Sequence, residues 1–109
     1  MLPKNKRITR GLFKEIISKK RYFNSEHFTL LSTQAEGGEA RFAVSVAKKI
    51  SKKAVIRNRT RRRVYSAIRN FISIIKPGLY LIVAKPNADK MKGEKLTEEL
   101  NQLFVSCRL

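Results

Sequence analysis

The chain has 109 residues, a hydrophobic share of 42% and a formal net charge of +17. A chain of this length and apolar content is expected to fold as one domain rather than to behave as a disordered basic tail. Its charge far exceeds what solubility needs, so we expect a polyanionic partner, such as nucleic acid or an anionic membrane. One cysteine excludes an internal disulfide, and one histidine besides it is too few for a zinc site.

The chain also lacks the patterns of a membrane or exported protein. No apolar run approaches the roughly 18 residues that cross a bilayer. The basic N-terminus is not followed by the apolar stretch of a signal peptide. We therefore expect a cytoplasmic protein without a membrane partner.

The first half of the chain is predicted to hold one helix and two strands. Thr9 is a candidate cap for a helix whose apolar residues fall on one side, namely Leu12, Phe13, Ile16 and Ile17. Residues 26–32 form a predicted strand, and "EGGE" at 36–39 is typical of a hairpin turn. The next strand alternates, with Phe42, Val44 and Val46 on one face and Ala43, Ser45 and Ala47 on the other.

The second half is predicted to hold a long helix, a buried strand and a last helix. Ser51 is the candidate cap of the long helix, which is expected to end near Pro77-Gly78. Residues 79–84 are apolar on both faces, as in an interior strand. Thr97 is expected to open the last helix, whose apolar residues are Leu100, Leu103, Phe104 and Cys107. The order strand, helix, strand predicts a βαβ crossover, so the fold class is α/β or α+β, in one domain over residues 1–109.

Positive charge is concentrated at the start of the long helix. Nine lysines and arginines lie between Lys48 and Arg63, and no acid occurs between Glu39 and Asp89. At 100° per residue, one arc carries Val64, Ala67, Ile68, Phe71 and Ile75, and Arg57 and Arg61 continue it towards the N-terminus. Because unpaired buried guanidinium groups are costly, we expect these arginines to project past the core, add little to the stability of the free chain and contact phosphates.

The sequence offers no set of residues for catalysis. His27 lies in a strand pattern without an obvious acidic or nucleophilic partner, and Cys107 is expected to be a core thiol. We predict no catalytic residue and no metal ligand. A self-sufficient nuclease is disfavoured for want of clustered carboxylates, and a DNA-binding regulator for want of a helix-turn-helix or basic-zipper pattern.

The stretch "RFAVSVAKKISKKAVIRNRTRRRVYSAIR" resembles the signature of the bacterial ribonuclease P protein subunit. The matching features are Arg57-Asn58-Arg59 on a helix and a preceding strand that ends in Ser45-x-x-Lys48-Lys49. "RITRGLFKEII", "GLYLIVAKP" and "LNQLFVSCRL" are similar to the family's opening helix, last strand and closing helix. The resemblance therefore covers nearly the whole chain.

The resemblance implies a fold and a division of labour. The fold would be a small two-layer sandwich with a mixed sheet, about three helices and a left-handed βαβ crossover, similar to a domain of a small-subunit ribosomal protein. The reaction would be hydrolytic removal of the 5′ leader from precursor tRNA. The RNA subunit would be the catalyst and hold the Mg²⁺ ions, while the protein would bind no cofactor and need no further protein partner.

The resemblance also implies two binding surfaces. The contact with the RNA subunit would comprise Lys48, Lys49, Lys52, Lys53, Arg57, Asn58, Arg59, Arg61, Arg62 and Arg63. The site for the precursor-tRNA leader would comprise Phe13, Ile17, Phe28 and Ser45, with core packing as the alternative role of the three apolar residues. The competing function is a ribosomal or ribosome-assembly RNA-binding protein, from which only the Arg-Asn-Arg block and its flanking strand distinguish this chain.

Overall fold

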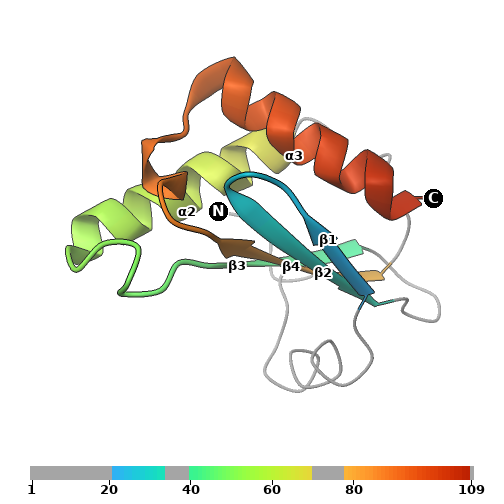
Figure 1. Ribbon diagram of the computed structural model, residues 1–109, viewed down its shortest axis with the longest axis horizontal. Coiled ribbons are helices and arrows are strands. Elements are labelled where there is room, and N and C mark those ends of the chain that lie inside the picture. The colour runs from blue at the N-terminus through green and yellow to red at the C-terminus, as the bar shows by residue number, and fades with distance from the viewer. Residues whose placement is uncertain (1–20, 34–39, 70–77, 109) are drawn as a thin grey trace.

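The computed structural model describes residues 21–33, 40–69 and 78–108. These residues form four strands, one short 3₁₀ helix and two α-helices (Figure 1). In chain order the elements are β1 (Arg21–Asn24), β2 (Phe28–Thr33), β3 (Ala40–Ser45), α2 (Ala54–Ile68), β4 (Gly78–Ala84), η3 (Ala88–Lys90) and α3 (Gly93–Arg108). The predicted first helix and the predicted turn at 36–39 lie outside the described residues.

The four strands form one mixed sheet in the order β1-β2-β4-β3. β4 pairs antiparallel with β2 and parallel with β3, so it lies in the interior, as its apolar residues on both faces predict. The hairpin predicted to join residues 26–32 to the next strand is wrong. These strands are β2 and β3 in the structure, and β4 lies between them. The strand that is apolar on both sides takes the interior position, and β3, whose Ser45 is exposed, takes the edge.

The predicted βαβ unit is confirmed. β3 and β4 run parallel in a register from Ala40 opposite Gly78 to Ser45 opposite Val83, and α2 is part of the connection between them. A parallel pair needs such a crossover, since a tight turn can join only antiparallel neighbours. The left-handed sense of this crossover stays a prediction.

Both described α-helices cover the same face of the sheet (Figure 1). The core between the layers contains Phe42, Tyr80 and Phe104, whose rings touch: Phe42 stacks on Tyr80 at a centroid distance of 5.4 Å. The predicted alternation is confirmed, since Phe42, Val44 and Val46 all belong to this core. A smaller apolar cluster of Leu31, Leu79 and Leu81 lies on the opposite face.

The predicted helix starts differ from the observed ones. α2 begins after Lys53 without a side-chain cap, and the Ser51 hydroxyl instead accepts a hydrogen bond from the Lys53 N–H at 3.3 Å. α3 begins at Gly93, so Thr97 lies inside it and its hydroxyl donates to the Gly93 carbonyl at 3.3 Å. Ser51 and Thr97 both form hydrogen bonds with nearby backbone groups. Serine and threonine do this in turns and inside helices as well as at helix starts, so the sequence does not distinguish these positions.

The core faces of the two helices agree with the prediction where the structure describes them. Leu100, Leu103 and Phe104 of α3 are buried, as are Val64, Ala67 and Ile68 of α2. α2 ends at Ile68, and its predicted continuation to Pro77-Gly78 falls outside the described residues, as does the side chain of Cys107.

Candidate nucleic-acid interface

One side of α2 packs on the core and the other is exposed. The exposed side carries Val55, Asn58, Arg59, Arg62, Ser66 and the flanking Arg69, which we call the exposed stripe of α2. At 100° per residue these six positions fall within an arc of about 100°. They extend over about 21 Å of helix at 1.5 Å per residue. The sequence therefore folds into a narrow surface on which three arginines lie among shorter, uncharged side chains.

Four exposed lysines lie at the N-terminal end of this stripe. Lys48 and Lys49 occupy a turn after β3 that the Ile50 N–H closes by donating to the Ala47 carbonyl at 3.0 Å. Lys52 and Lys53 directly precede α2. The first turn of α2 contains no acid and its N-cap residue provides no side-chain hydrogen bond. The positive end of the helix dipole therefore adds to the lysine charges and favours a bound anion.

Arg57 does not project past the core as predicted. Its side chain is half-buried, and Nη1 donates to the carbonyls of Ser51 and Lys52, both at 2.9 Å. These two bonds count against the prediction that Arg57 adds little to the stability of the free chain, because they hold the backbone that directly precedes α2. The core position on this side of the helix is taken by Thr60, which is 1% exposed and donates to the Ile56 carbonyl at 2.9 Å.

Arg61 and Arg63 are also half-buried and engaged within the protein. Arg61 Nη1 donates to Asn58 Oδ1 at 2.5 Å, which orients both side chains on one turn. Arg63 Nη1 donates to the Asp89 carbonyl at 3.3 Å and so links α2 to η3. Of the arginines predicted to bind the RNA subunit, Arg59 and Arg62 are thus the ones that face outwards most fully.

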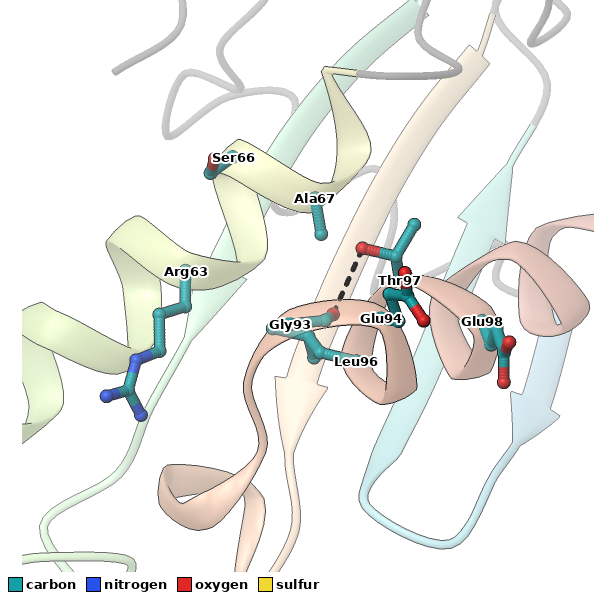
Figure 2. Close-up of a pocket in the computed structure, with 8 residues that line it drawn as sticks. All are labelled: Arg63, Ser66, Ala67, Gly93, Glu94, Leu96, Thr97 and Glu98. Atoms are coloured by element: carbon teal, nitrogen blue, oxygen red, sulfur yellow. Dashed lines mark hydrogen bonds between the residues drawn. The ribbon is translucent and has the colours of Figure 1, made fainter.

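Arg63 also borders a cavity of about 570 Å³ between α2 and α3. Figure 2 shows Arg63, Ser66 and Ala67 on the α2 side and Glu94, Leu96 and Glu98 on the α3 side. The guanidinium of Arg63 points away from Ser66 and Ala67 in this view. Because Glu94 and Glu98 lie on its α3 wall, this cavity is less favourable to phosphates than the exposed stripe, which carries no acid.

Phe28 and Ser45 are the predicted leader residues that the structure describes, and they lie on opposite faces of the sheet. Phe28 is 0% exposed and belongs to the core beneath the helices. Ser45 is exposed and belongs to the alternate set of β3, on the opposite face of the sheet from Phe42 and Val44. Phe28 is therefore a core residue and is removed from the site, while Phe13 and Ile17 lie outside the described residues.

The face that carries Ser45 has an accessible row of side chains across all four strands. Asn24 is opposite Thr29, Thr29 is opposite Val83, and Val83 is opposite Ser45. Each is exposed or half-buried, and the Thr29 hydroxyl donates to Asn24 Oδ1 at 2.8 Å. We call these four residues the sheet row. The alternation of each strand marks these positions in sequence, but the strand order that aligns them does not follow from it.

A polar cluster connects the β1–β2 turn to α3, and sequence reasoning missed it. His27 Nδ1 lies 2.6 Å from Glu99 Oε1, and the other carboxylate oxygen accepts from the His27 N–H at 2.8 Å and the Ser25 hydroxyl at 2.6 Å. The expectation that His27 lacks an acidic partner is wrong. Glu99 is 72 positions away, so no local pattern indicates it.

This cluster has the residue types of a hydrolase but not the arrangement. A nucleophilic serine needs its hydroxyl bonded to the base, whereas Ser25 donates to the carboxylate. Lys85 Nζ donates to the Ser25 carbonyl at 2.7 Å and holds the same turn against β4. The cluster therefore fastens the turn to α3 and β4.

Glu99 makes this fastening dependent on pH. Burial alone would raise the pKa of Glu99, but hydrogen bonds from Ser25 and His27, together with the charge of His27, lower that pKa below its ordinary value of 4.5. A carboxyl group whose pKa is lowered by folding stabilises the fold above its unfolded pKa. That contribution is lost as the pH falls through the folded value.

Neither a metal centre nor a membrane helix occurs in the part of the chain that the structure describes. No three His, Cys, Asp or Glu side chains within 21–33, 40–69 and 78–108 gather closely enough to hold a metal ion. Over the same ranges, no helix has the length and apolar character to cross a bilayer. Among the described residues, the exposed stripe of α2 and the sheet row are the two candidate surfaces for recognition.

The sequence profile of the family described as Ribonuclease P matches residues 2–108. This chain belongs to the ribonuclease P protein family. It is 38% identical over 95 residues to the ribonuclease P protein component of Microcystis aeruginosa, covering 83% of this chain and 78% of that protein. It is 29% identical over 110 residues to the ribonuclease P protein component of Picosynechococcus sp., covering 99% of this chain and 95% of that protein.

Solved ribonuclease P proteins share the fold. The structure from Staphylococcus aureus matches with a TM-score of 0.85 at 21% identity, covering 96% of this chain and 97% of that chain. The structure from Thermotoga maritima matches with a TM-score of 0.65 at 24% identity, covering 94% of this chain and 87% of that chain. The α+β fold with its mixed four-stranded sheet is thus the fold of ribonuclease P proteins.

Membership decides between the alternatives that the sequence left open. The chain is a protein subunit of ribonuclease P, the endoribonuclease of tRNA 5′ maturation, and associates with the ribonuclease P RNA. The ribosomal and DNA-binding alternatives are thereby set aside. The surface that contacts each RNA is the remaining question, and the exposed stripe and the sheet row are the two candidates.

Proposed function

We propose that the chain binds the ribonuclease P RNA subunit through the exposed stripe of α2 and the lysines before it. The observation that carries this proposal is the exposure of Arg59 and Arg62 on a helix whose first turn contains no acid. The proposed contact comprises Lys48, Lys49, Lys52, Lys53, Arg57, Asn58, Arg59, Arg61, Arg62 and Arg63.

The members of this contact have different roles. The exposed lysines and arginines neutralise phosphates and release counterions, and the planar fork of arginine suits phosphate oxygens better than an ammonium does. Arg57 holds the lysine turn through the Ser51 and Lys52 carbonyls, and Asn58 orients Arg61. Loss of a positioning residue should therefore weaken assembly by more than the loss of one charge.

We further propose that catalysis resides in the RNA subunit and that the Mg²⁺ it needs is bound there. No trio of metal-ligating side chains within the described ranges fits such an ion. The protein's part is to bring positive charge to a polyanionic assembly that would otherwise repel its substrate. The cytoplasm is the compartment we propose for this assembly.

The leader of precursor tRNA is proposed to cross the sheet face that carries Ser45. The sheet row offers hydroxyl, amide and small apolar groups to such a strand. Single strands of any sequence are held by stacking on apolar and aromatic groups within a basic groove. Phe13 and Ile17 stay in this proposal as stacking residues from the N-terminal segment. Phe28 does not, because its ring is fully buried.

Holoenzyme assembly tests the RNA-subunit contact. Arg59→Gln should weaken binding of the RNA subunit by about 1–3 kcal/mol and lower the slope of log affinity against log salt by about 0.7–0.9. Arg21→Gln on β1 removes an exposed arginine from another element and is the matched control. If Arg59→Gln assembles with the affinity and salt slope of the parent, the proposed contact is wrong.

Cleavage assays test the division of labour. RNA-free protein should leave precursor tRNA intact, and addition of the RNA subunit with Mg²⁺ should produce the mature 5′ end. Cleavage by rigorously RNA-free protein would contradict the proposal.

A further inference from the structure

The exposed stripe of α2 extends beyond the Arg-Asn-Arg block and ends at a small cavity. This cavity measures about 150 Å³ and is lined by Arg62, Tyr65, Ser66 and Arg69. Positions 62, 65, 66 and 69 are three, four and seven residues apart, so they share one side of the helix. The backbone N–H of Arg69 donates to the Tyr65 carbonyl at 3.2 Å, which keeps Arg69 in helical register with the others.

The lining of the cavity favours a small anion. Two guanidinium groups and a serine hydroxyl supply hydrogen-bond donors, and arginine pairs of this kind bind phosphate oxygens with charge-assisted bonds. The volume is below the roughly 300–1,000 Å³ of pockets that take drug-sized ligands. A single phosphate group fits these dimensions better than a nucleotide cofactor does.

Tyr65 gives the cavity a fixed wall. Its side chain is half-buried and packs against the main core cluster. A tyrosine ring held in this way loses little conformational entropy on binding and can contact a ribose or a base. The cavity thus combines donors for a phosphate with a flat apolar surface beside them, which is the chemistry of a nucleic-acid strand.

The charged residues around the cavity favour one path for a bound RNA strand. Arg59 and Arg62 lie on the same stripe, and Arg69 is about 15 Å from Arg59 along the helix at 1.5 Å per residue. Ser66 lines both this cavity and the larger one between α2 and α3, so it forms the ridge between them. Beyond that ridge lie Glu94 and Glu98, which repel phosphates. A strand bound at Arg59 can therefore continue along the stripe but not across α3.

We propose that the cavity of Arg62, Tyr65, Ser66 and Arg69 binds a backbone phosphate of the RNA subunit, with the Tyr65 ring against the adjoining ribose. The RNA interface then extends almost three helical turns, or about 15 Å, beyond the Arg-Asn-Arg block. This inference rests on the proposed function and deepens it, since the same stripe supplies both contacts.

Assembly of the full chain with the RNA subunit, measured over a range of salt concentrations, tests the inference. Arg69→Gln should weaken assembly by about 5- to 150-fold and lower the salt slope by about 0.7–0.9. Arg69→Lys should keep most of the salt slope and lose affinity, because it retains the charge without the fork. Arg59→Gln and Arg21→Gln, measured in parallel, report on the proposed function and on unspecific charge loss.

The outcomes separate the two claims. If Arg69→Gln matches the parent while Arg59→Gln is impaired, the phosphate site is overturned and the proposed function stands. If neither variant is impaired, both fail. A fall in Tm for Arg69→Gln with an unchanged salt slope also overturns the site, since Arg69 would then act only as a cation at the helix C-terminus. An effect confined to binding of precursor tRNA by preassembled holoenzyme would overturn the assignment to the RNA subunit.

Discussion

Val55 allows the stability of α2 and its RNA contact to be changed in opposite directions. Its side chain is 73% exposed in the first turn of α2, between Lys53 and Arg59 on a surface of positive charge. An exposed valine there contributes little packing to the free chain. We predict that Val55→Glu stabilises the free protein and weakens its assembly with the RNA subunit.

The gain in stability follows from the composition of the first turn. That turn contains no acid, so a glutamate complements the positive end of the helix dipole by about 0.3–1 kcal/mol. Position 55 is also four residues before Arg59, and a Glu-to-Arg pair at this spacing adds about 0.2–0.5 kcal/mol. Together these terms predict about 0.5–1.5 kcal/mol. Thermal melting should show a Tm higher by a few degrees.

The loss in binding follows from the same carboxylate. In the complex it would lie among the phosphates that the lysines and Arg59 are proposed to contact, so we expect at least a tenfold weaker assembly, or about 1.4 kcal/mol. Val105 of α3 is 46% exposed, and Val105→Glu changes the net charge equally at a site away from the stripe. Val55→Gln controls for polarity without charge and should stay near the parent in both assays.

Two results would refute this reasoning. A lower Tm for Val55→Glu would mean that the first turn is not short of negative charge. Equal RNA affinity for Val55→Glu and Val105→Glu would mean that only net charge matters and that the stripe is not the contact.

Three further predictions address the other surfaces. Glu99→Gln should lower the free energy of unfolding by about 1–3 kcal/mol at neutral pH and by less below about pH 4.5. Denaturation at several pH values measures this, and an equal loss at every pH would contradict the lowered pKa of Glu99. Phe28→Leu should lower stability by about 0.5–3 kcal/mol without changing the ratio of precursor to mature tRNA affinity, and a changed ratio would restore Phe28 to the leader site. Ser45→Glu should weaken binding of precursor tRNA more than that of mature tRNA, and an equal effect on both would count against the sheet row.

Periodicity predicted the features that depend on neighbouring residues. The alternation around Phe42 and Val44 gave the buried face of β3, and the apolar spacing around Val64 and Leu100 gave the core sides of the two helices. The order of charge along the chain also placed the cationic surface at the start of α2. These three predictions depend only on which side of a helix or strand faces water, and the periodicity of apolar and charged residues indicates that side.

Apart from the βαβ unit, the features that depend on distant residues did not follow from the sequence. The partnership of His27 with Glu99 joins residues far apart in the chain, and the insertion of β4 between β2 and β3 is decided by the whole sheet. Phe28 is a second example. The pattern of its strand indicates that the ring is buried, but it does not indicate which face of the sheet the ring lies on. Arg57 extended the apolar arc in projection, yet its length let it reach back to the Ser51 carbonyl.

The central claim is that the stripe of α2 holds this chain on the ribonuclease P RNA. The most direct measurement is to purify the tagged full chain from its host and sequence the RNA that accompanies it, for the parent and for a variant with Arg59→Gln and Arg62→Gln together. We expect one dominant structured RNA to accompany the parent protein, and we expect that complex to cleave precursor tRNA at the mature 5′ end when Mg²⁺ is present. The same RNA should be strongly depleted from the variant. Ribosomal RNA alone with the parent, or undiminished recovery of the same RNA with the variant, would contradict the central claim.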